Sequence, residues 1–280
     1  MRNRTCRFCG SPNIVKAGKR KNLHSEKQRW LCRSCGRRFT QDDGFLHLWY
    51  EGEMVSKAID LYWTGLSCRT ASSFLERHEA RAPGKSTVHR WIHRFASLVR
   101  GFISRLRPGL SGRWYADEMF TSLEGKPALV WEVMDEGTRF WLCALPTEGR
   151  VGTERQAEQA LAEALENAKE RPRDLLTDGS LAYIGGGRWV LGWRRVRLVR
   201  RISYYQGWNN LMERKIQTTR WRTRLSRGLG SLARGWLEGF RIHYNFVREH
   251  MGLGRTPAEA AGLDLPLLRN RWLGLIWLAV

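Results

Sequence analysis

The middle of the chain contains three short runs that are rich in aromatic and branched residues. They occupy residues 113–120, 127–135 and 138–146, and glycine-containing turns separate them. Runs of this length and composition between such turns predict β-strands. We therefore expect three consecutive antiparallel strands in this part of the chain.

The pattern then changes to that of a helix. Residues 153–170 carry alanine and leucine at helical spacing, and Thr153 and Gln156 form a capping box at the start. The runs DLLTDG at 174–179 and RRVRLVR at 194–200 predict two more strands, the first of them buried, and a basic helix follows them. Three strands, a helix, two strands and a helix, in this order, predict the RNase H-like fold, an α/β fold with a mixed five-stranded sheet.

Helical periodicity also dominates residues 54–107, ahead of the strands. One helix is predicted to end at Gly65, a second to begin after the N-cap Ser67, and a third to begin at the N-cap Ser86. The third helix has apolar residues at i, i+3, i+4 and i+7, which predicts one packed face: Val88, Trp91, Ile92 and Phe95. In a helix-turn-helix the start and the opposite face of this helix would contact DNA: Ser86, Thr87, His89, Arg90, His93 and Arg94. An ordinary amphipathic helix in a small bundle is the alternative.

The net charge indicates what kind of molecule this chain binds. Lysine and arginine number 48 against 27 acidic residues, which leaves a formal net charge of +21. A polyanion such as DNA is the natural partner of so basic a chain. Residues 270–280 are mostly apolar but too few to span a bilayer, which needs about 20 apolar residues. We expect a docking helix there and no membrane partner, and the N-terminus lacks a secretory signal, which predicts a cytoplasmic location.

Four cysteines near the N-terminus have the spacing of a metal site. They form two C-x-x-C pairs, and a glycine follows each pair and permits a tight turn. In a reducing compartment such pairs favour one structural Zn²⁺ with four thiolate ligands over disulfides or a redox pair. The predicted ligands are Cys6, Cys9, Cys32 and Cys35. The basic surface of this zinc ribbon either contacts DNA phosphates or is simply solvated.

Three acids lie at informative places in the predicted fold. Asp117 is on the first strand, Asp178 ends the fourth, and Glu213 is on the late basic helix. Glu213 has no charged residue three or four positions away, so a helical ion pair does not explain it. Oxygen ligands that converge from distant segments suit a pair of Mg²⁺ ions, which activate an attacking oxygen and stabilise a leaving one in phosphodiester chemistry.

Three motifs then carry a resemblance to a known family. They are WYADEMF around Asp117, LLTDGSLAY around Asp178, and NNLMERKIQTTRWRTR around Glu213. They resemble the catalytic motifs of DDE-type insertion-sequence transposases from bacteria and archaea. The interval between Asp178 and Glu213 and the segment at 244–263 resemble those of the cointegrate-forming group often called IS six.

The resemblance implies a function and roles for particular residues. Asp117, Asp178 and Glu213 would bind two Mg²⁺ or Mn²⁺ ions, and the enzyme would cut at the terminal inverted repeats of its element and join the 3′ end to target DNA. Asn209 or Asn210 would support Glu213. Basic residues of the same helix would hold the DNA backbone: Arg214, Lys215, Arg220, Arg222 and Arg224. Pairing of two element ends implies a homodimer or a larger assembly.

Some alternatives remain open at this level. Glu118 is a competing ligand for Asp117, because neighbouring residues of a strand point to opposite faces. Asp135, Asp174 and Glu124 are competing acids that are more easily explained as turn or cap residues. A DNA-binding regulator without catalysis, and a nuclease of the same fold that cuts without joining, are the alternative functions.

The predicted domain order follows from these segments. A zinc ribbon occupies residues 1–45, a helix-turn-helix domain 46–107, the RNase H-like catalytic domain 108–265, and an apolar C-terminal helix 266–280.

Overall fold

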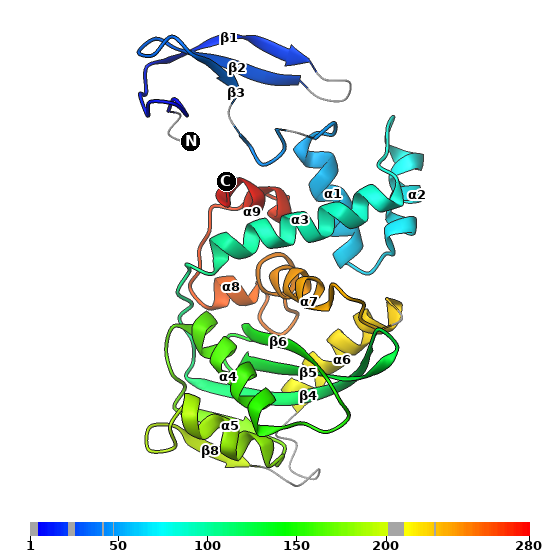
Figure 1. Cartoon of the computed structure of the whole chain (residues 1–280), viewed down its shortest axis with the longest axis vertical. Helices are drawn as coiled ribbons and strands as arrows, with labels where there is room; N and C mark the ends of the chain where they lie inside the picture. The colour runs from blue at the N-terminus through cyan, green and yellow to red at the C-terminus, as the bar shows by residue number, and fades with distance from the viewer. Residues whose placement is uncertain (1–4, 22–25, 41, 47, 201–209, 227) are drawn as a thin grey trace.

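The computed structural model stacks three units along the long axis of the molecule (Figure 1). It describes residues 5–21, 26–40, 42–46, 48–200, 210–226 and 228–280. A small β unit lies at one end, a helical layer lies in the middle, and a five-stranded sheet with its covering helices lies at the other end.

The N-terminal unit is a three-stranded antiparallel sheet in the order β1-β2-β3. Its strands are β1 (Ile14–Lys21), β2 (Glu26–Cys32) and β3 (Arg38–Thr40). Its buried cluster consists of Cys6, Cys32 and Phe39 and is separate from the main core. So small an apolar cluster indicates that this unit needs a further source of stability.

The helical layer consists of three consecutive helices and one from the C-terminus. They are α1 (Gly52–Trp63), α2 (Cys68–His78), α3 (Lys85–Ile103) and α9 (Arg271–Leu278). The side chain of Ser67 accepts a hydrogen bond from the Thr70 N–H, so the predicted cap of the second helix is confirmed. The third helix begins two residues earlier than predicted, with Gly84 as the N-cap, so Ser86 lies inside the first turn. The apolar C-terminal helix α9 packs on α1 and α3 of its own chain.

The sheet has the strand order β6-β5-β4-β7-β8. β4 pairs with β5 and β5 with β6 in antiparallel fashion, whereas β7 pairs with β4 and with β8 in parallel fashion. The strands are β4 (Arg113–Leu123), β5 (Lys126–Asp135), β6 (Trp141–Glu148), β7 (Asp174–Thr177) and β8 (Arg197–Arg200). This is the mixed five-stranded sheet of the RNase H-like fold, and that prediction is confirmed.

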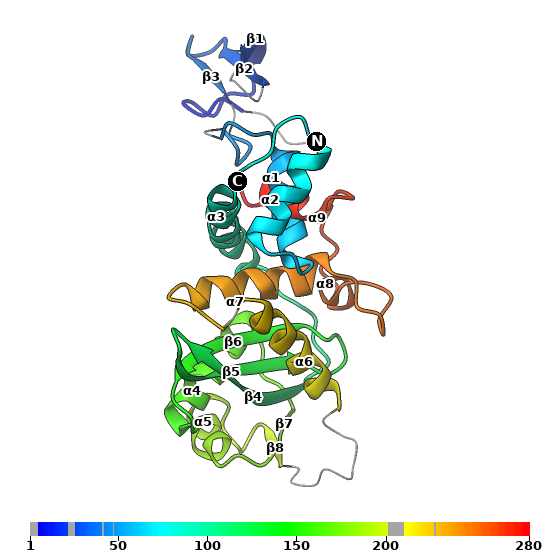
Figure 2. The same ribbon diagram turned by 90° about the vertical axis from the view of Figure 1, so that its right-hand side faces the viewer.

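Helices cover both faces of the sheet (Figure 2). α4 (Glu154–Ala168) and α5 (Ala182–Val190) lie on one face, and α6 (Asn210–Leu225) lies on the other. The capping box of Thr153 and Gln156 is present at the start of α4, as predicted. The sequence pattern does not predict α5, because the glycines at 185–187 within it disfavour a helix in isolation.

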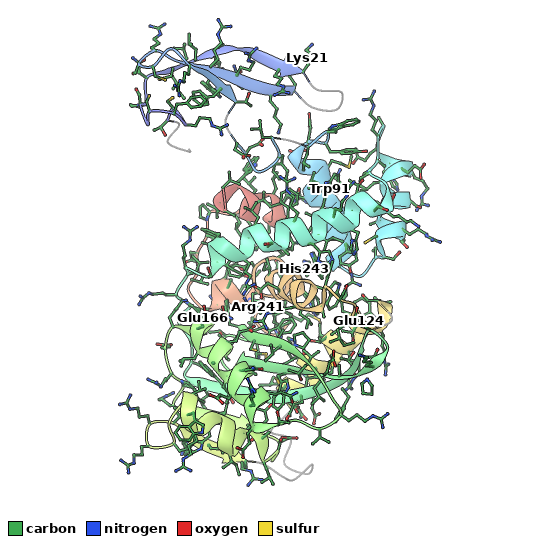
Figure 3. All side chains as sticks on the ribbon, in the orientation of Figure 1. Lys21, Trp91, Glu124, Glu166, Arg241 and His243 are labelled. Atoms are coloured by element: carbon green, nitrogen blue, oxygen red, sulfur yellow. The ribbon has the colours of Figure 1, made fainter. Side chains whose placement is uncertain are left out.

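A stack of aromatic rings joins the helical layer to the sheet. Trp63 of α1 stacks on Phe240, whose ring meets that of Trp141 of β6 edge to face. Phe240 belongs to α7 (Ala233–Ile242), which continues into the π-helix η2 (His243–Val247) and is followed by α8 (Pro257–Ala260). Figure 3 shows Arg241 and His243 at this junction. One continuous apolar core therefore runs through both units.

The turn after α1 provides the first testable prediction. Gly65 has a φ of +129°, and a Cβ at this position would lie 2.6 Å from the Trp221 ring of α6. We expect Gly65→Ala to lower the free energy of unfolding by about 1–3 kcal/mol, because the positive φ strains an alanine there, while the 53% exposed Trp221 ring can move aside. Gly101→Ala is the matched control. Gly101 lies within α3 with nothing within 4 Å of the added Cβ, so this change should stabilise the protein by about 1 kcal/mol. Urea unfolding measures both, and an equal effect of the two changes would contradict the prediction.

A second prediction concerns acid stability. Burial of His243, with Arg248 and Arg222 nearby, lowers the pKa of its imidazole to about 3. The unfolded chain binds a proton near pH 6.5 and the native state does not, so the stability contribution is complete above pH 6.5 and is lost as the pH falls towards 3. At pH 5 we expect a loss of about 2 kcal/mol from this group.

His243→Asn provides the control for this prediction. The Trp272 indole donates to Nδ1 of His243, and the asparagine oxygen preserves an acceptor there without a titrating group. Urea unfolding at about pH 7.5 and about pH 5 gives the difference in unfolding free energy between wild type and variant. This difference should change by about 2 kcal/mol between the two pH values. A pH-independent difference would show that His243 does not carry this effect.

None of the helices in the described ranges has both the length and the apolar character needed to cross a membrane.

Candidate active site

Asp117 and Asp178 are brought together by the parallel pairing of β4 and β7. The register places Ala116 opposite Thr177, so the next residue of each strand is an aspartate. Asp117 continues β4, whereas Asp178 follows the last residue of β7. Ligand oxygens of Asp117, Glu118 and Asp178 all lie within 4.8 Å of one another. The prediction that the two aspartates converge at one place on the sheet is therefore confirmed.

Asp117 and Glu118 reach this acid cluster from opposite faces of the sheet. Asp117 is the cross-strand partner of Glu132, which forms an ion pair with Lys215 of α6, so Asp117 belongs to the face that α6 covers. Glu118 is the cross-strand partner of Trp131, whose ring meets the Tyr183 ring of α5 edge to face. Glu118 therefore belongs to the face that α4 and α5 cover.

Crowding of three carboxylates changes the acidity of Glu118. Burial, and then the charges of Asp178 and Asp117, raise the pKa of Glu118 to about 7. Asp178 also accepts a hydrogen bond from the Ser180 N–H, and Asp117 accepts one from the Glu118 N–H. A divalent cation would relieve the repulsion among these carboxylates, and carboxylate oxygens are the ligands that Mg²⁺ prefers. The donor set therefore fits a magnesium site.

Glu213 lies on the first turn of α6 and is exposed. It is not a member of either potential metal-binding group found among the described residues. Its predicted neighbour Asn210 begins the same helix, and Asn209 lies outside the described residues. The structure thus unites two of the three predicted acids with Glu118 and leaves the third on a neighbouring helix.

Glu213 nevertheless lies on the same side of α6 as Arg220, a residue that adjoins β4. Arg220 follows Glu213 by seven residues, which returns to the same side of a helix within about 20°. Arg220 lines a pocket of about 360 Å³ together with Phe120 and neighbouring residues of β4. Lys215, two residues after Glu213, pairs with Glu132, the cross-strand partner of Asp117, so the start of α6 lies beside this part of the sheet.

Two of the predicted DNA contacts on α6 are corrected. Lys215 and Arg222 are buried, at 3% and 1% exposure, and each has interior partners. Lys215 pairs with Glu132, and the guanidinium of Arg222 donates to the Tyr62 carbonyl and lies over the Tyr62 ring. A buried and partnered cation is unavailable to a phosphate. The sequence did not reveal this because α6 buries a broad face that includes polar residues.

The remaining cations of α6 stay available to solvent. Arg214 and Arg224 are exposed, and Arg220 is half-buried. Arg220 and Arg224 line the same 360 Å³ pocket beside β4. The basic surface of α6 therefore adjoins the strand that carries Asp117. Trp221 is 53% exposed on this helix, whereas Trp236 of α7 is buried in the core.

The predicted recognition helix α3 has the expected two faces. Val88, Trp91, Ile92 and Phe95 are buried, as predicted. The polar residues lie outside this core: Ser86, His89, Arg90 and Arg94 are exposed, and Thr87 and His93 are half-buried. Burial and the charge of His89 lower the pKa of His93. This face can meet a phosphate backbone, and its role in DNA recognition stays a prediction.

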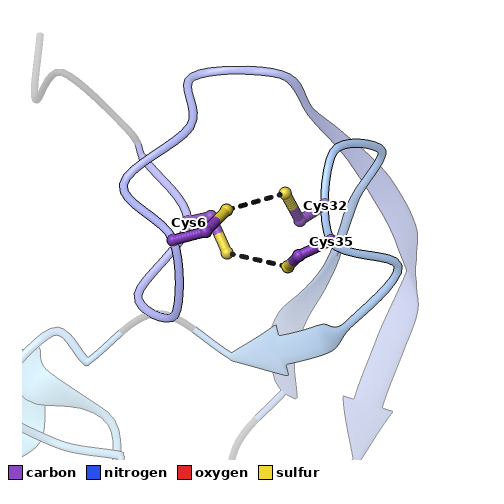
Figure 4. Close-up of side chains that lie close together, drawn as sticks. Cys6, Cys32 and Cys35 are labelled. Atoms are coloured by element: carbon purple, nitrogen blue, oxygen red, sulfur yellow. Dashed lines mark hydrogen bonds between the residues drawn. The ribbon is translucent and has the colours of Figure 1, made fainter.

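The four N-terminal cysteines converge in one cluster (Figure 4). Sγ of Cys6 lies 3.7 Å from that of Cys35, and Sγ of Cys9 lies 3.6 Å from that of Cys32. A tetrahedral zinc with bonds of about 2.3 Å separates its sulfurs by about 3.8 Å, whereas a disulfide needs about 2 Å. The geometry fits one Zn²⁺ and excludes disulfides within this cluster.

The local backbone conformation favours metal binding by these cysteines. Gly10 and Gly36 have φ values of +72° and +68°, so each glycine adopts the left-handed conformation that the tight turn requires. Burial opposes ionisation of the Cys32 thiol, but hydrogen bonds from the backbone N–H groups of Cys35 and Ser34 lower its pKa to about 6. A thiolate is the form that binds zinc.

The competing acids have structural roles, although Asp174 lies in strand β7 and not in a turn or a cap. Asp135 is buried and accepts hydrogen bonds from Ser111 and Thr138 at the end of β5. Asp174 pairs with Arg197, and Glu124 adopts a positive φ of 51° in the turn between β4 and β5. None of the three belongs to the acid cluster.

Comparisons with known proteins give similarity at the level of the fold. No family model and no curated protein matches this sequence. The chain is similar to the HTLV-2 integrase catalytic core domain in complex with magnesium (trimeric form), with 12% identity, a TM-score of 0.41, and coverage of 56% of this chain and 98% of that one. It is also similar to a chain of the simian T-cell lymphotropic virus intasome in complex with PP2A regulatory subunit B56 gamma, with 16% identity, a TM-score of 0.43 and 74% coverage of each chain. For the BIV integrase catalytic core domain the identity is 14% and the TM-score 0.39, with coverage of 54% and 93%.

Proposed function

We propose that this chain is a DDE-type transposase, a metal-dependent enzyme that cuts DNA at the ends of an insertion sequence and joins them to target DNA. One observation carries the proposal. Asp117 and Asp178 meet where the parallel strands β4 and β7 of an RNase H-like sheet lie side by side, next to a helix with exposed arginines. The motif resemblance around these aspartates and Glu213 supports the same assignment.

Each part of the proposed site has its own task. Asp117 and Asp178 would hold Mg²⁺ or Mn²⁺, with Glu213 or Glu118 as the third carboxylate. A pair of such ions, when bound, activates the attacking oxygen and stabilises the leaving oxygen of the phosphodiester. Arg214, Arg220 and Arg224 would hold the DNA backbone beside the acids by charge-assisted hydrogen bonds.

The other two units would hold the ends of the element. The exposed side of α3 carries Arg90 and Arg94 together with side chains that can donate to bases or phosphates. The N-terminal unit would bind one Zn²⁺ through its four cysteines, and its strands β1 and β2 add lysines and arginines. Because an element has two ends, we expect the active assembly to be a dimer or larger.

A strand-transfer assay tests the proposal. A labelled duplex that carries the DNA flanking this gene is incubated with the purified protein, Mg²⁺ and a target plasmid, with Glu213→Gln in parallel. We expect wild type to nick the repeat and transfer the labelled strand, and the variant to bind the duplex without either reaction.

The other outcomes separate the alternative functions. Binding without cleavage by wild type would indicate a regulator, and cleavage without joining would indicate a nuclease. Full activity of Glu213→Gln, together with inactivity of Glu118→Gln, would assign the third carboxylate to Glu118.

A further inference from the structure

A buried ion pair connects α6 to the centre of the sheet. Nζ of Lys215 lies 2.5 Å from Oε2 of Glu132, and the two side chains are 1% and 0% exposed. Lys215 also donates to the Thr219 hydroxyl, at 2.8 Å. Its ammonium lies 3.1 Å from the centre of the Trp141 ring, a cation–π contact from β6.

General stability does not explain such a pair well. Removing two charges from water costs several kcal/mol for each ion, and apolar side chains of the same volume often serve stability equally well. The second oxygen of Glu132 is buried and has no hydrogen-bond partner among the described residues. Breaking a buried pair so that one charge is left without its partner is strongly destabilising, so arrangements of α6 that separate Lys215 from Glu132 are disfavoured.

The position of the pair indicates which arrangement it selects. Glu132 of β5 is the cross-strand partner of Asp117. Lys215 is two residues from Glu213 on α6. Residues two apart on a helix are about 200° apart, so Glu213 points to nearly the opposite side of α6 from Lys215. Because the ion pair fixes which side of α6 meets the sheet, it fixes the height and the rotation of the helix, and with them the place of Glu213.

We propose that Lys215 and Glu132 are positioning residues that hold Glu213 in register with Asp117 and Asp178. The inference rests on the proposed function for the role of Glu213, and its structural part, the fixed register of α6, stands on the contacts alone. A slide by one helical residue would move Glu213 by about 1.5 Å and rotate it by about 100°. Such a rotation would point the carboxylate in a different direction relative to Asp117 and Asp178.

The test compares an apolar replacement of the pair with a matched control. The test variant is Lys215→Met combined with Glu132→Leu, which removes both charges and keeps the volume. The control is Arg241→Met combined with Glu238→Leu. Arg241 and Glu238 form another ion pair of low exposure, within α7, and Arg241 also donates to the Trp141 carbonyl. Both variants are prepared as full-length, zinc-loaded protein.

Four measurements are made on wild type and both variants. They are the melting temperature, hydrogen exchange of the amides of α6, β4 and β5, Mn²⁺ affinity by titration calorimetry, and the kcat and KM of nicking. We expect the test variant to keep a melting temperature near wild type, while amides of the first half of α6 exchange at least about tenfold faster than in wild type. Mn²⁺ affinity and kcat should each fall about tenfold or more, with KM for DNA unchanged. The control should match wild type in exchange of α6 and in Mn²⁺ affinity.

The results separate this inference from the proposed function. The positioning role is overturned if the test variant has the same exchange of α6, the same Mn²⁺ affinity and the same kcat as wild type. Equal losses in test and control variants would also overturn it, because they would reflect core damage. If wild type neither binds Mn²⁺ at these acids nor nicks DNA, the proposed function fails, and with it the role of Glu213. The exchange data then still decide whether the ion pair sets the register of α6. If the test variant is misfolded, Lys215→Arg is measured instead: it should keep the slow exchange of α6, and fast exchange despite the retained charge would overturn the register.

Discussion

Asp178→Asn is expected to reduce the rate of DNA nicking by about 10³-fold or more while binding of the same duplex is retained. Asp178 belongs to the acid cluster and follows the last residue of β7. Asparagine keeps the shape of the aspartate side chain but removes its negative charge. Carboxylates that hold a catalytic metal support several kcal/mol of transition-state stabilisation, and about 4 kcal/mol corresponds to about 10³-fold in rate. The measurement is single-turnover nicking of a labelled duplex, with binding followed by gel shift.

The control for this change is Glu166→Gln. Glu166 is an exposed acid on α4, labelled in Figure 3, and it lies outside the acid cluster. It should keep wild-type nicking. If Asp178→Asn nicks as fast as Glu166→Gln, the acid cluster is not the catalytic centre. If Asp178→Asn loses DNA binding as well, the acids act in folding or in binding and not in catalysis alone.

Cys32→Ser is expected to remove the metal from the N-terminal unit and to unfold that unit alone. Cys32 is fully buried and belongs both to the sulfur cluster and to the small apolar cluster. Binding of a structural zinc contributes about 10–16 kcal/mol of folding free energy in small zinc units. Among the residues of this unit that the structure describes, no other source of stability approaches that contribution, because their buried cluster contains three residues.

Mass spectrometry measures the zinc content, and proteolysis measures whether the segment 5–40 is folded. We expect wild type to contain one zinc per chain and the variant to contain none, with rapid cleavage in the N-terminal unit and an unchanged melting temperature for the rest. Cys68→Ser is the control, since Cys68 is half-buried on α2 and outside the cluster. A protected N-terminal unit in Cys32→Ser would contradict the prediction, as would a wild-type protein without zinc.

The order of elements could be predicted because local patterns determine it. The runs of branched and aromatic residues became β4, β5 and β6, and the alanine and leucine stripe became the buried side of α4. Burial of one face imposes a period on the sequence, and this period is visible without a structure. The spacing of the cysteines was equally informative, because a four-thiolate site needs two short loops.

The extent of burial within an element was much harder to predict. The run of cations on α6 predicts DNA contacts at Lys215 and Arg222, yet both are buried. Whether a cation on a helix faces DNA or the core depends on which partners the other elements place opposite it. For Lys215 these partners are Glu132 of β5 and Trp141 of β6, which are 83 and 74 residues away in the chain.

The acid cluster was likewise predictable from the sequence only in part. The sequence by itself determined that Asp117 and Asp178 end up together, because two parallel neighbouring strands bring equivalent positions side by side. It did not determine that Glu118 joins them from the opposite face, since only the covering helix α5 closes that side of the strand. The sequence also left open the height and rotation of α6, and therefore the place of Glu213. Only the tertiary structure decided these, because they follow from packing between segments that are distant in the chain, and such contacts leave no local pattern in the sequence.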